Sequence, residues 1–103
     1  MSWVKVCKDE SLKPGELFEF DYQDKKILLV KLDNKIYASD RICTHAYADL
    51  VSGILNEKEK TVTCPLHMSV FNLENGIPQN LPAEEPLKLY ETKISDGEIL
   101  LLI

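Results

Sequence analysis

The sequence of 103 residues predicts a single all-β domain, a sandwich or barrel built from short antiparallel strands. Short runs of β-branched and aromatic residues alternate with turn signals along most of the chain. No segment keeps an apolar period of 3.6 residues, and helical structure is limited to one short turn near residues 45–50. Prolines at positions 78, 82 and 86 prevent a regular helix or strand between residues 77 and 86.

The first half of the chain contains four expected strands and two clear turns. The strands are residues 3–7, 17–20, 26–32 and 35–38. Lys-Pro-Gly-Glu at residues 13–16 has the composition of a turn and leads into the second strand. Asp33-Asn34 separates the third strand from the fourth, which predicts a β-hairpin.

The second half of the chain contains two further expected hairpins. Residues 61–63 and 70–72 are expected to pair, which places Cys64 and His67 at the hairpin tip. A turn at Glu74-Asn75-Gly76 precedes the proline-rich connection. The last hairpin is expected from strands 87–95 and 98–103 around an Asp96-Gly97 turn.

The charge of the chain narrows its class of partner. Seventeen acidic against twelve basic residues give a net charge of −5. This balance argues against nucleic acid and against an anionic membrane surface, which both favour clustered Lys and Arg. It favours a protein partner with a basic patch. The first ten residues contain no apolar run long enough for a secretory signal, so we expect a cytoplasmic protein.

Both histidines and two of the three cysteines lie in two short stretches, Cys43-Thr44-His45 and Cys64-Pro65-Leu66-His67. Thiolate and neutral imidazole are good ligands for borderline-soft transition metals, so the spacing predicts a metal site. No nucleophile–base pair, phosphate loop or pair of carboxylates is present, and we assign no catalytic residue. Cys7 has no histidine nearby and is interpreted as a packing residue. Asp49 and Glu57 are interpreted as solvated charges.

Three kinds of metal centre could use these four side chains. Structural zinc accepts two cysteines and two histidines, but its usual motifs pair cysteine with cysteine and histidine with histidine. A mononuclear copper site requires a different ligand ratio. In a Rieske [2Fe–2S] centre, two cysteines hold one iron and two histidines hold the other. One Cys and one His in each stretch favours the Rieske centre, and a zinc-stabilised interaction module is the alternative.

The segment CTHAYADLVSG, followed after ten residues by CPLHMSVF, resembles the pair of boxes in Rieske proteins. Nearly the whole chain is similar to the small Rieske-type ferredoxins of bacterial ring-hydroxylating dioxygenases and related oxygenases. The resemblance implies the Rieske iron–sulfur fold, an antiparallel β-sandwich with a small cluster-binding subdomain of two facing loops. It implies a base at residues 1–40 and 73–103, and a cluster-binding subdomain at about residues 41–72.

The resemblance also implies one [2Fe–2S] cluster per chain and a set of four ligands. Cys43 and Cys64 would hold the inner iron, and His45 and His67 the outer iron through Nδ1, with both Nε2 edges at the surface. Gly53 would permit a tight backbone path in the first box. Leu50 and Phe71 are interpreted as core residues under the loops.

The function implied by the resemblance is one-electron transfer rather than catalysis. Such a carrier takes electrons from a flavin-containing reductase that uses NAD(P)H and passes them to a terminal oxygenase. Contacts would be transient and would involve the tip, including Tyr47 and Met68, and the carrier is expected to be monomeric. The alternative from this fold is the small Rieske-like subunit of a larger reductase, such as nitrite reductase.

Three positions separate the chain from the high-potential Rieske proteins, and a fourth is shared with them. Those proteins have an extra cysteine in each box, where this chain has Ala48 and Leu66, so it lacks their disulfide between the loops. They also have Ser and Tyr hydroxyls near the cluster; this chain keeps the serine as Ser69, where the ferredoxins usually have Gly, but has Phe71 in place of the tyrosine. Ser69 is therefore a candidate tuning residue. We expect a midpoint potential near roughly −150 mV rather than +300 mV.

Overall fold

The computed structural model describes residues 1–103 and contains ten strands and two short 3-10 turns. The strands are β1 (Trp3–Lys8), β2 (Phe18–Tyr22), β3 (Lys25–Leu32), β4 (Lys35–Asp40), β5 (Ile54–Asn56), β6 (Thr61–Thr63), β7 (Val70–Asn72), β8 (Leu89–Tyr90), β9 (Thr92–Ser95) and β10 (Glu98–Leu102). The 3-10 turns are η1 (Asp9–Ser11) and η2 (Leu50–Ser52). All strand pairs are antiparallel, which confirms the predicted fold class. No helix is long and apolar enough to cross a membrane.

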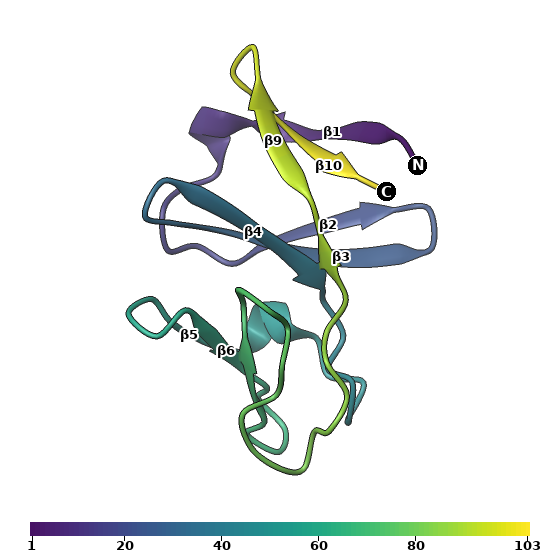
Figure 1. Ribbon diagram of the computed structural model, residues 1–103, viewed down its shortest axis with the longest axis vertical. Helices are drawn as coiled ribbons and strands as arrows, with labels where there is room; N and C mark the ends of the chain where they lie inside the picture. The colour runs from purple at the N-terminus through teal and green to yellow at the C-terminus, as the bar shows by residue number, and fades with distance from the viewer.

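The strands form three sheets that are stacked along the long axis of the molecule (Figure 1). The upper sheet has the order β1-β10-β9, and the middle sheet has the order β2-β3-β4-β8. The small lower sheet has the order β5-β6-β7. The upper and middle sheets form the sandwich, and the lower sheet carries the loop that contains Cys64.

Strand β3 lies in the centre of this stack and is buried on both faces. Ile27 and Leu29 belong to the apolar core shared with the upper sheet. Leu28, Val30 and Leu32 belong to the larger core shared with the lower sheet. Because successive side chains of a strand point to opposite faces, a strand covered on both sides needs an unbroken apolar run. Residues 27–30, Ile-Leu-Leu-Val, form such a run.

The tight hairpin turns agree with their sequences. Asp33 and Asn34 have φ values of 51° and 61°, and Asp96 and Gly97 have φ values of 51° and 74°. Two successive left-handed residues match the right-handed twist of the flanking strands, and these residue types adopt that conformation readily.

Three local features were missed or mispredicted. The sequence predicted neither η1 nor β5, and it predicted one strand over residues 87–95. In the structure that segment is divided at Glu91: β8 pairs with β4 in the middle sheet, and β9 pairs with β10 in the upper sheet. The change of sheet depends on partners far away in the chain, which local strand propensity does not encode.

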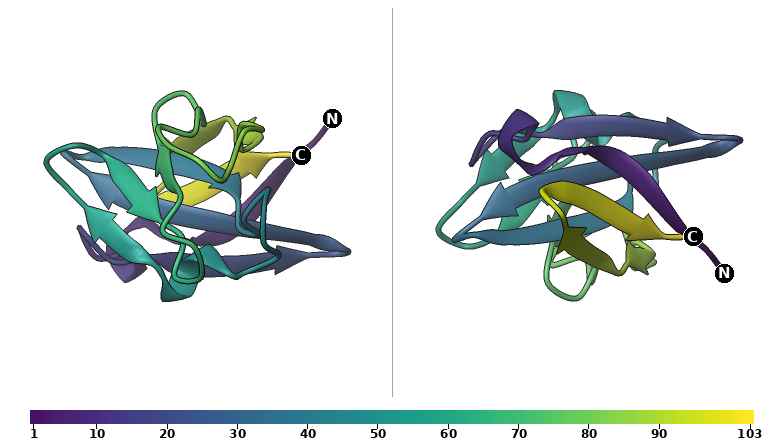
Figure 2. Two further views of the ribbon diagram at one scale, coloured as in Figure 1. Left: turned by 90° about the horizontal axis from the view of Figure 1, so that it is seen from below. Right: turned by 90° about the horizontal axis from the view of Figure 1, so that it is seen from above.

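The two ends of the chain lie side by side, as both views in Figure 2 show. The Ser2 N–H donates to the Ile103 carbonyl at 2.7 Å, and the Ile103 N–H donates to the Ser2 carbonyl at 2.9 Å. Both ends therefore belong to the upper sheet, at the opposite end of the molecule from the cysteine-containing loops (Figure 1).

Candidate metal centre

Both Cys/His stretches lie in loops at the lower end of the molecule (Figure 1). Loop one, residues 43–48, lies between β4 and η2. Loop two, residues 64–69, connects β6 to β7, as the sequence predicted. We refer to the two loops together as the tip.

The two loops have the same local design. The Cys43 N–H donates to the Ala48 carbonyl at 2.9 Å, and the Cys64 N–H donates to the Ser69 carbonyl at 2.8 Å. The residue before each acceptor is left-handed, with φ of 53° at Tyr47 and 59° at Met68. Each loop therefore folds back on its own cysteine.

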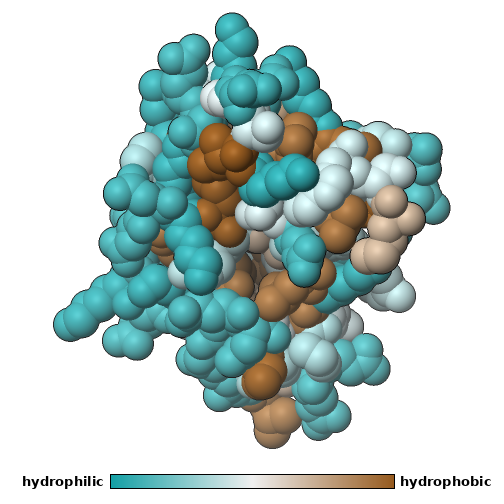
Figure 3. Space-filling view, turned by 45° about the horizontal axis from the view of Figure 1, so that its top comes forward, coloured by the Kyte–Doolittle hydropathy of each residue, from teal (hydrophilic) through white to brown (hydrophobic).

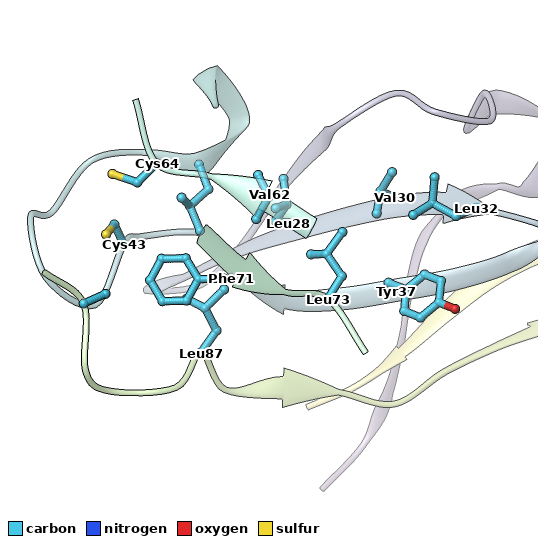
Figure 4. Packing of buried hydrophobic residues seen from close by; sticks show 12 residues of the cluster. Leu28, Val30, Leu32, Tyr37, Cys43, Val62, Cys64, Phe71, Leu73 and Leu87 are labelled. Carbon is cyan, nitrogen blue, oxygen red and sulfur yellow. The ribbon is translucent and has the colours of Figure 1, made fainter. Parts of the chain in front are cut away.

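The thiols lie on the inner side of the tip. Cys43 and Cys64 are buried with relative exposures of 3% and 0%, and neither forms a disulfide. Figure 4 shows their sulfur atoms at the loop end of the core, beyond Phe71 and Leu87. Burial raises the pKa of the Cys43 thiol, the backbone N–H groups of His45 and Ala46 oppose this effect, and the adjacent Cys64 adds to it. N–H donors directed at a buried sulfur are what a thiolate metal ligand requires.

The imidazoles lie on the outer side of the tip. His45 and His67 are exposed, and their ring centroids are 5.3 Å apart with an angle of 62° between the ring planes. No three His, Cys, Asp or Glu side chains converge on a point where one ion could be held. Tetrahedral zinc needs four ligands at one ion. A pair of inner thiols and a pair of outer imidazoles suits a group with two metal atoms.

The proline-rich segment, residues 77–86, is hydrogen-bonded to both loops. The Thr44 hydroxyl donates to the Glu85 carbonyl at 2.8 Å, and the Ala83 N–H donates to the Ser69 hydroxyl at 3.1 Å. Asn80 accepts from the Val70 N–H at 2.7 Å and donates to the Met68 carbonyl at 3.1 Å. The sequence does not reveal this role of Asn80, because its partners Val70 and Met68 are ten and twelve residues away in the chain.

Ser69 is fully buried, and its hydroxyl oxygen accepts the Ala83 N–H. The structure therefore gives this side chain a role that the sequence did not suggest, the attachment of loop two to the proline-rich segment. Its hydroxyl proton has no acceptor among the hydrogen bonds of the protein.

The interpretation of Asp49 as a solvated charge was wrong. Its Oδ2 accepts from Arg41 Nε at 3.1 Å, and its Oδ1 accepts from the Val51 N–H at 3.0 Å at the start of η2. Because these contacts involve a residue eight positions away and a 3-10 turn, a local charge pattern does not reveal them. The one available signal was that Arg41 is the only arginine of the chain.

Leu50 and Phe71 are both fully buried, as expected for core residues under the loops. Gly53 has a φ of −82°, so it does not need the left-handed freedom of glycine. Its role is close approach, because a Cβ atom at this position would collide with the Thr63 carbonyl oxygen. An alanine would push β5 away from β6.

Large apolar side chains are exposed in the tip, at Tyr47, Leu66 and Met68, and next to it in the proline-rich segment, at Leu81. Tyr47, Leu66, Met68 and Leu81 expose 90%, 60%, 53% and 72% of their surface. Figure 3 shows hydrophobic residues at the lower end of the molecule, and further hydrophobic groups in the middle and upper part of the same face. Residues 42–56 and 61–87 contain four acidic residues and no Lys or Arg.

Comparisons with known proteins agree with this arrangement. The sequence profile of the Rieske [2Fe-2S] domain matches residues 2–91. The chain is 37% identical to the 3-phenylpropionate/cinnamic acid dioxygenase ferredoxin subunit of Photorhabdus laumondii. The alignment covers 100% of this chain and 96% of that subunit. It superposes on the ferredoxin of carbazole 1,9a-dioxygenase from Nocardioides aromaticivorans with a TM-score of 0.92 and 31% identity, covering 98% of this chain and 97% of that one. A ferredoxin in complex with the oxygenase of carbazole 1,9a-dioxygenase superposes with a TM-score of 0.89 and 28% identity, covering 96% and 91% of the two chains.

Proposed function

The chain belongs to the family of Rieske [2Fe–2S] domains, and from this premise we propose that it carries single electrons from a flavin-containing, NAD(P)H-dependent reductase to a terminal oxygenase. It is an electron-transfer protein with a Rieske-type [2Fe–2S] cluster and not itself an enzyme. A ferredoxin of the same fold forms a complex with its oxygenase, which supports the second of the two partners.

We assign the cluster to Cys43, His45, Cys64 and His67. The observation that carries this assignment is the order of the donors, with buried thiols inside and exposed imidazoles outside. When bound, the cluster supplies reversible one-electron chemistry. The chain buries one side of the cluster, directs backbone N–H groups at a thiol, and leaves the imidazole side open to a partner. The cluster-binding part is about residues 41–72, and residues 1–40 and 73–103 form the base.

The partners are proposed to dock on the tip. Tyr47 and Met68 flank the histidines in sequence and are exposed, yet both adopt a left-handed conformation that costs a non-glycine residue about 1–2 kcal/mol. Because their backbone is strained and their side chains are exposed and apolar, we infer that Tyr47 and Met68 serve contact with a partner rather than folding. The acidic residues of the segments next to the tip, Asp49, Glu74, Glu84 and Glu85, would be complemented by basic residues around an apolar patch on the partner.

Such contacts are transient, as a shuttle requires, and the carrier is proposed to be a cytoplasmic monomer. Three free cysteines, two of them ligands under this assignment, are consistent with a reducing compartment.

The ligand assignment is tested with purified protein. Wild-type protein should contain two iron and two sulfide per chain and give a rhombic EPR signal when reduced. His67→Ala and Cys64→Ser should lose the signal and the electron transfer to an oxygenase. Cys7→Ser is the matched control and should change neither. A His67→Ala protein with an unchanged EPR spectrum, or wild-type protein that contains zinc, would contradict the assignment.

A further inference from the structure

Arg41 is the only arginine of the chain and its only buried charged residue, with 3% of its surface exposed. Arg41 is not a ligand of the proposed cluster, because arginine does not bind iron, so its burial needs another explanation. A guanidinium group with this degree of burial is costly unless its neighbours hold it in a fixed geometry.

The contacts of Arg41 join loop one to the middle sheet. Its Nε donates to Asp49 at 3.1 Å, and its Nη2 donates to Asp21 of β2 at 2.8 Å. Its backbone N–H donates to the Lys26 carbonyl at 3.0 Å, and its carbonyl accepts from the Leu50 N–H at 2.8 Å. Both ends of loop one are therefore attached through this single residue.

Three carboxylates lie within 3.9 Å of the Arg41 guanidinium, but all three are more exposed than the guanidinium. Side chains of Asp49, Asp21 and Glu19 expose 35%, 62% and 64% of their surface, so water screens them far more than it screens the guanidinium. Nη1 is buried without a hydrogen-bond partner, and a carboxylate oxygen of Glu19 is 3.9 Å away from it.

Arg41 lies close in the chain to Cys43, a proposed ligand of the cluster. Arg41 precedes Cys43 by two residues, which limits the separation of their Cα atoms to about 7 Å. Reduction adds one negative charge to the cluster, and a weakly screened cation nearby stabilises that charge.

We propose that Arg41 is a positioning residue that fixes loop one on the base and, through its buried charge, raises the midpoint potential of the cluster. The inference rests on the proposed ligand set. It concerns how readily the carrier accepts an electron and not which partners it serves.

The experiment compares two variants that break the same ion pair from opposite sides. Arg41→Gln removes the cation, and Asp49→Asn removes a carboxylate while its Oδ1 can still accept the Val51 N–H. Midpoint potentials are measured by redox titration followed by EPR. Asp96→Asn, in the β9–β10 turn at the other end of the molecule, is the control for net charge.

We expect Arg41→Gln to lower the midpoint potential, Asp49→Asn to raise it, and Asp96→Asn to leave it unchanged. A purely structural role predicts that both ion-pair variants shift the potential in the same direction or not at all, and either result would overturn the inference. Failure of the proposed function is distinguishable, because wild-type protein would then show no Rieske signal.

A third variant keeps the inference testable if Arg41→Gln does not accumulate. Arg41→Lys retains the charge but cannot bridge Asp21 and Asp49 with a planar fork. We expect its potential to stay near the wild-type value while its EPR lines broaden as loop one loosens. A lowered potential in Arg41→Lys together with an unshifted Asp49→Asn would refute the proposed charge effect.

Discussion

The base and the tip differ in the residue types at their left-handed positions and in the exposure of their apolar side chains. In the turns between strands, the left-handed non-glycine positions are polar, namely Gln23, Asp33, Asn34, Lys60 and Asp96. In the tip they are Tyr47 and Met68, two large side chains in contact with solvent. The base encloses most of its aliphatic residues between sheets, although Ile77, Leu81, Leu89 and Ile94 are exposed, whereas the tip exposes Leu66 and Met68 next to a histidine.

This difference indicates separate demands on the two regions. The base accepts residues that minimise strain and maximise burial, so its features are explained by stability. The tip holds exposed apolar side chains in a strained backbone next to the histidines, which stability does not explain. The following predictions test that division.

The largest effect on stability is expected from the core of the base. Leu101→Ala removes a fully buried side chain and should lower the free energy of unfolding by about 2–5 kcal/mol. Urea unfolding under anaerobic conditions measures this loss. The reduced EPR spectrum of the folded fraction should not change, and a changed spectrum would show that base and tip are not independent.

A smaller loss is expected where the proline-rich segment holds loop two. Asn80→Ala removes the hydrogen bonds to Val70 and Met68 and should cost about 1–2 kcal/mol of unfolding free energy. Unlike Leu101→Ala, it should also speed hydrogen exchange of amides in residues 64–70. Gln79→Ala serves as the neighbouring control, because its side chain makes no hydrogen bond in the structure. Unaltered exchange in loop two would contradict the role given to Asn80.

The tip should respond to glycine with a gain in stability and a loss of function. Tyr47→Gly relieves left-handed strain and should raise the free energy of unfolding by roughly 0.5–1 kcal/mol, after the entropy cost of glycine. Electron transfer to the oxygenase should slow, and stopped-flow oxidation of the reduced carrier measures the rate.

Gln23→Gly is the matched control in the base, because Gln23 has a φ of 55° in the β2–β3 turn. It should give a similar gain in stability with no change in the transfer rate. If Tyr47→Gly transferred electrons as fast as wild type, the tip would have no need of its exposed tyrosine.

The smallest effect concerns the pH dependence of the base. Burial, together with a hydrogen bond to Asp40 at 2.6 Å, raises the pKa of Tyr90. The protonated phenol is therefore favoured in the folded state, and its contribution is complete below the unfolded pKa of about 10. Stability should fall as the pH rises beyond that value, and less so in Tyr90→Phe. Denaturant midpoints at pH 9 and pH 11 measure the difference, and identical slopes for both proteins would argue against this origin.

Much of the fold and of the candidate site could be predicted from the sequence because their signals are local. Apolar runs, Asp-Asn and Asp-Gly turns, and the two Cys/His stretches lie within a few residues of one another. The unbroken apolar run at residues 27–30 even marks the strand that is buried on both faces. The presence of one Cys and one His in each stretch favours a two-iron centre on sequence alone.

Only the tertiary structure decided which distant groups meet. The ion pair of Arg41 with Asp21 spans twenty residues, and the hydrogen bond of Thr44 to Glu85 spans forty-one. The division of residues 87–95 between two sheets and the close approach of Gly53 to Thr63 likewise depend on packing. The spacing in the chain shows which side chains are available as ligands. The loops that hold these ligands are fixed by contacts with residues far away in the chain, and no local sequence pattern identifies those residues.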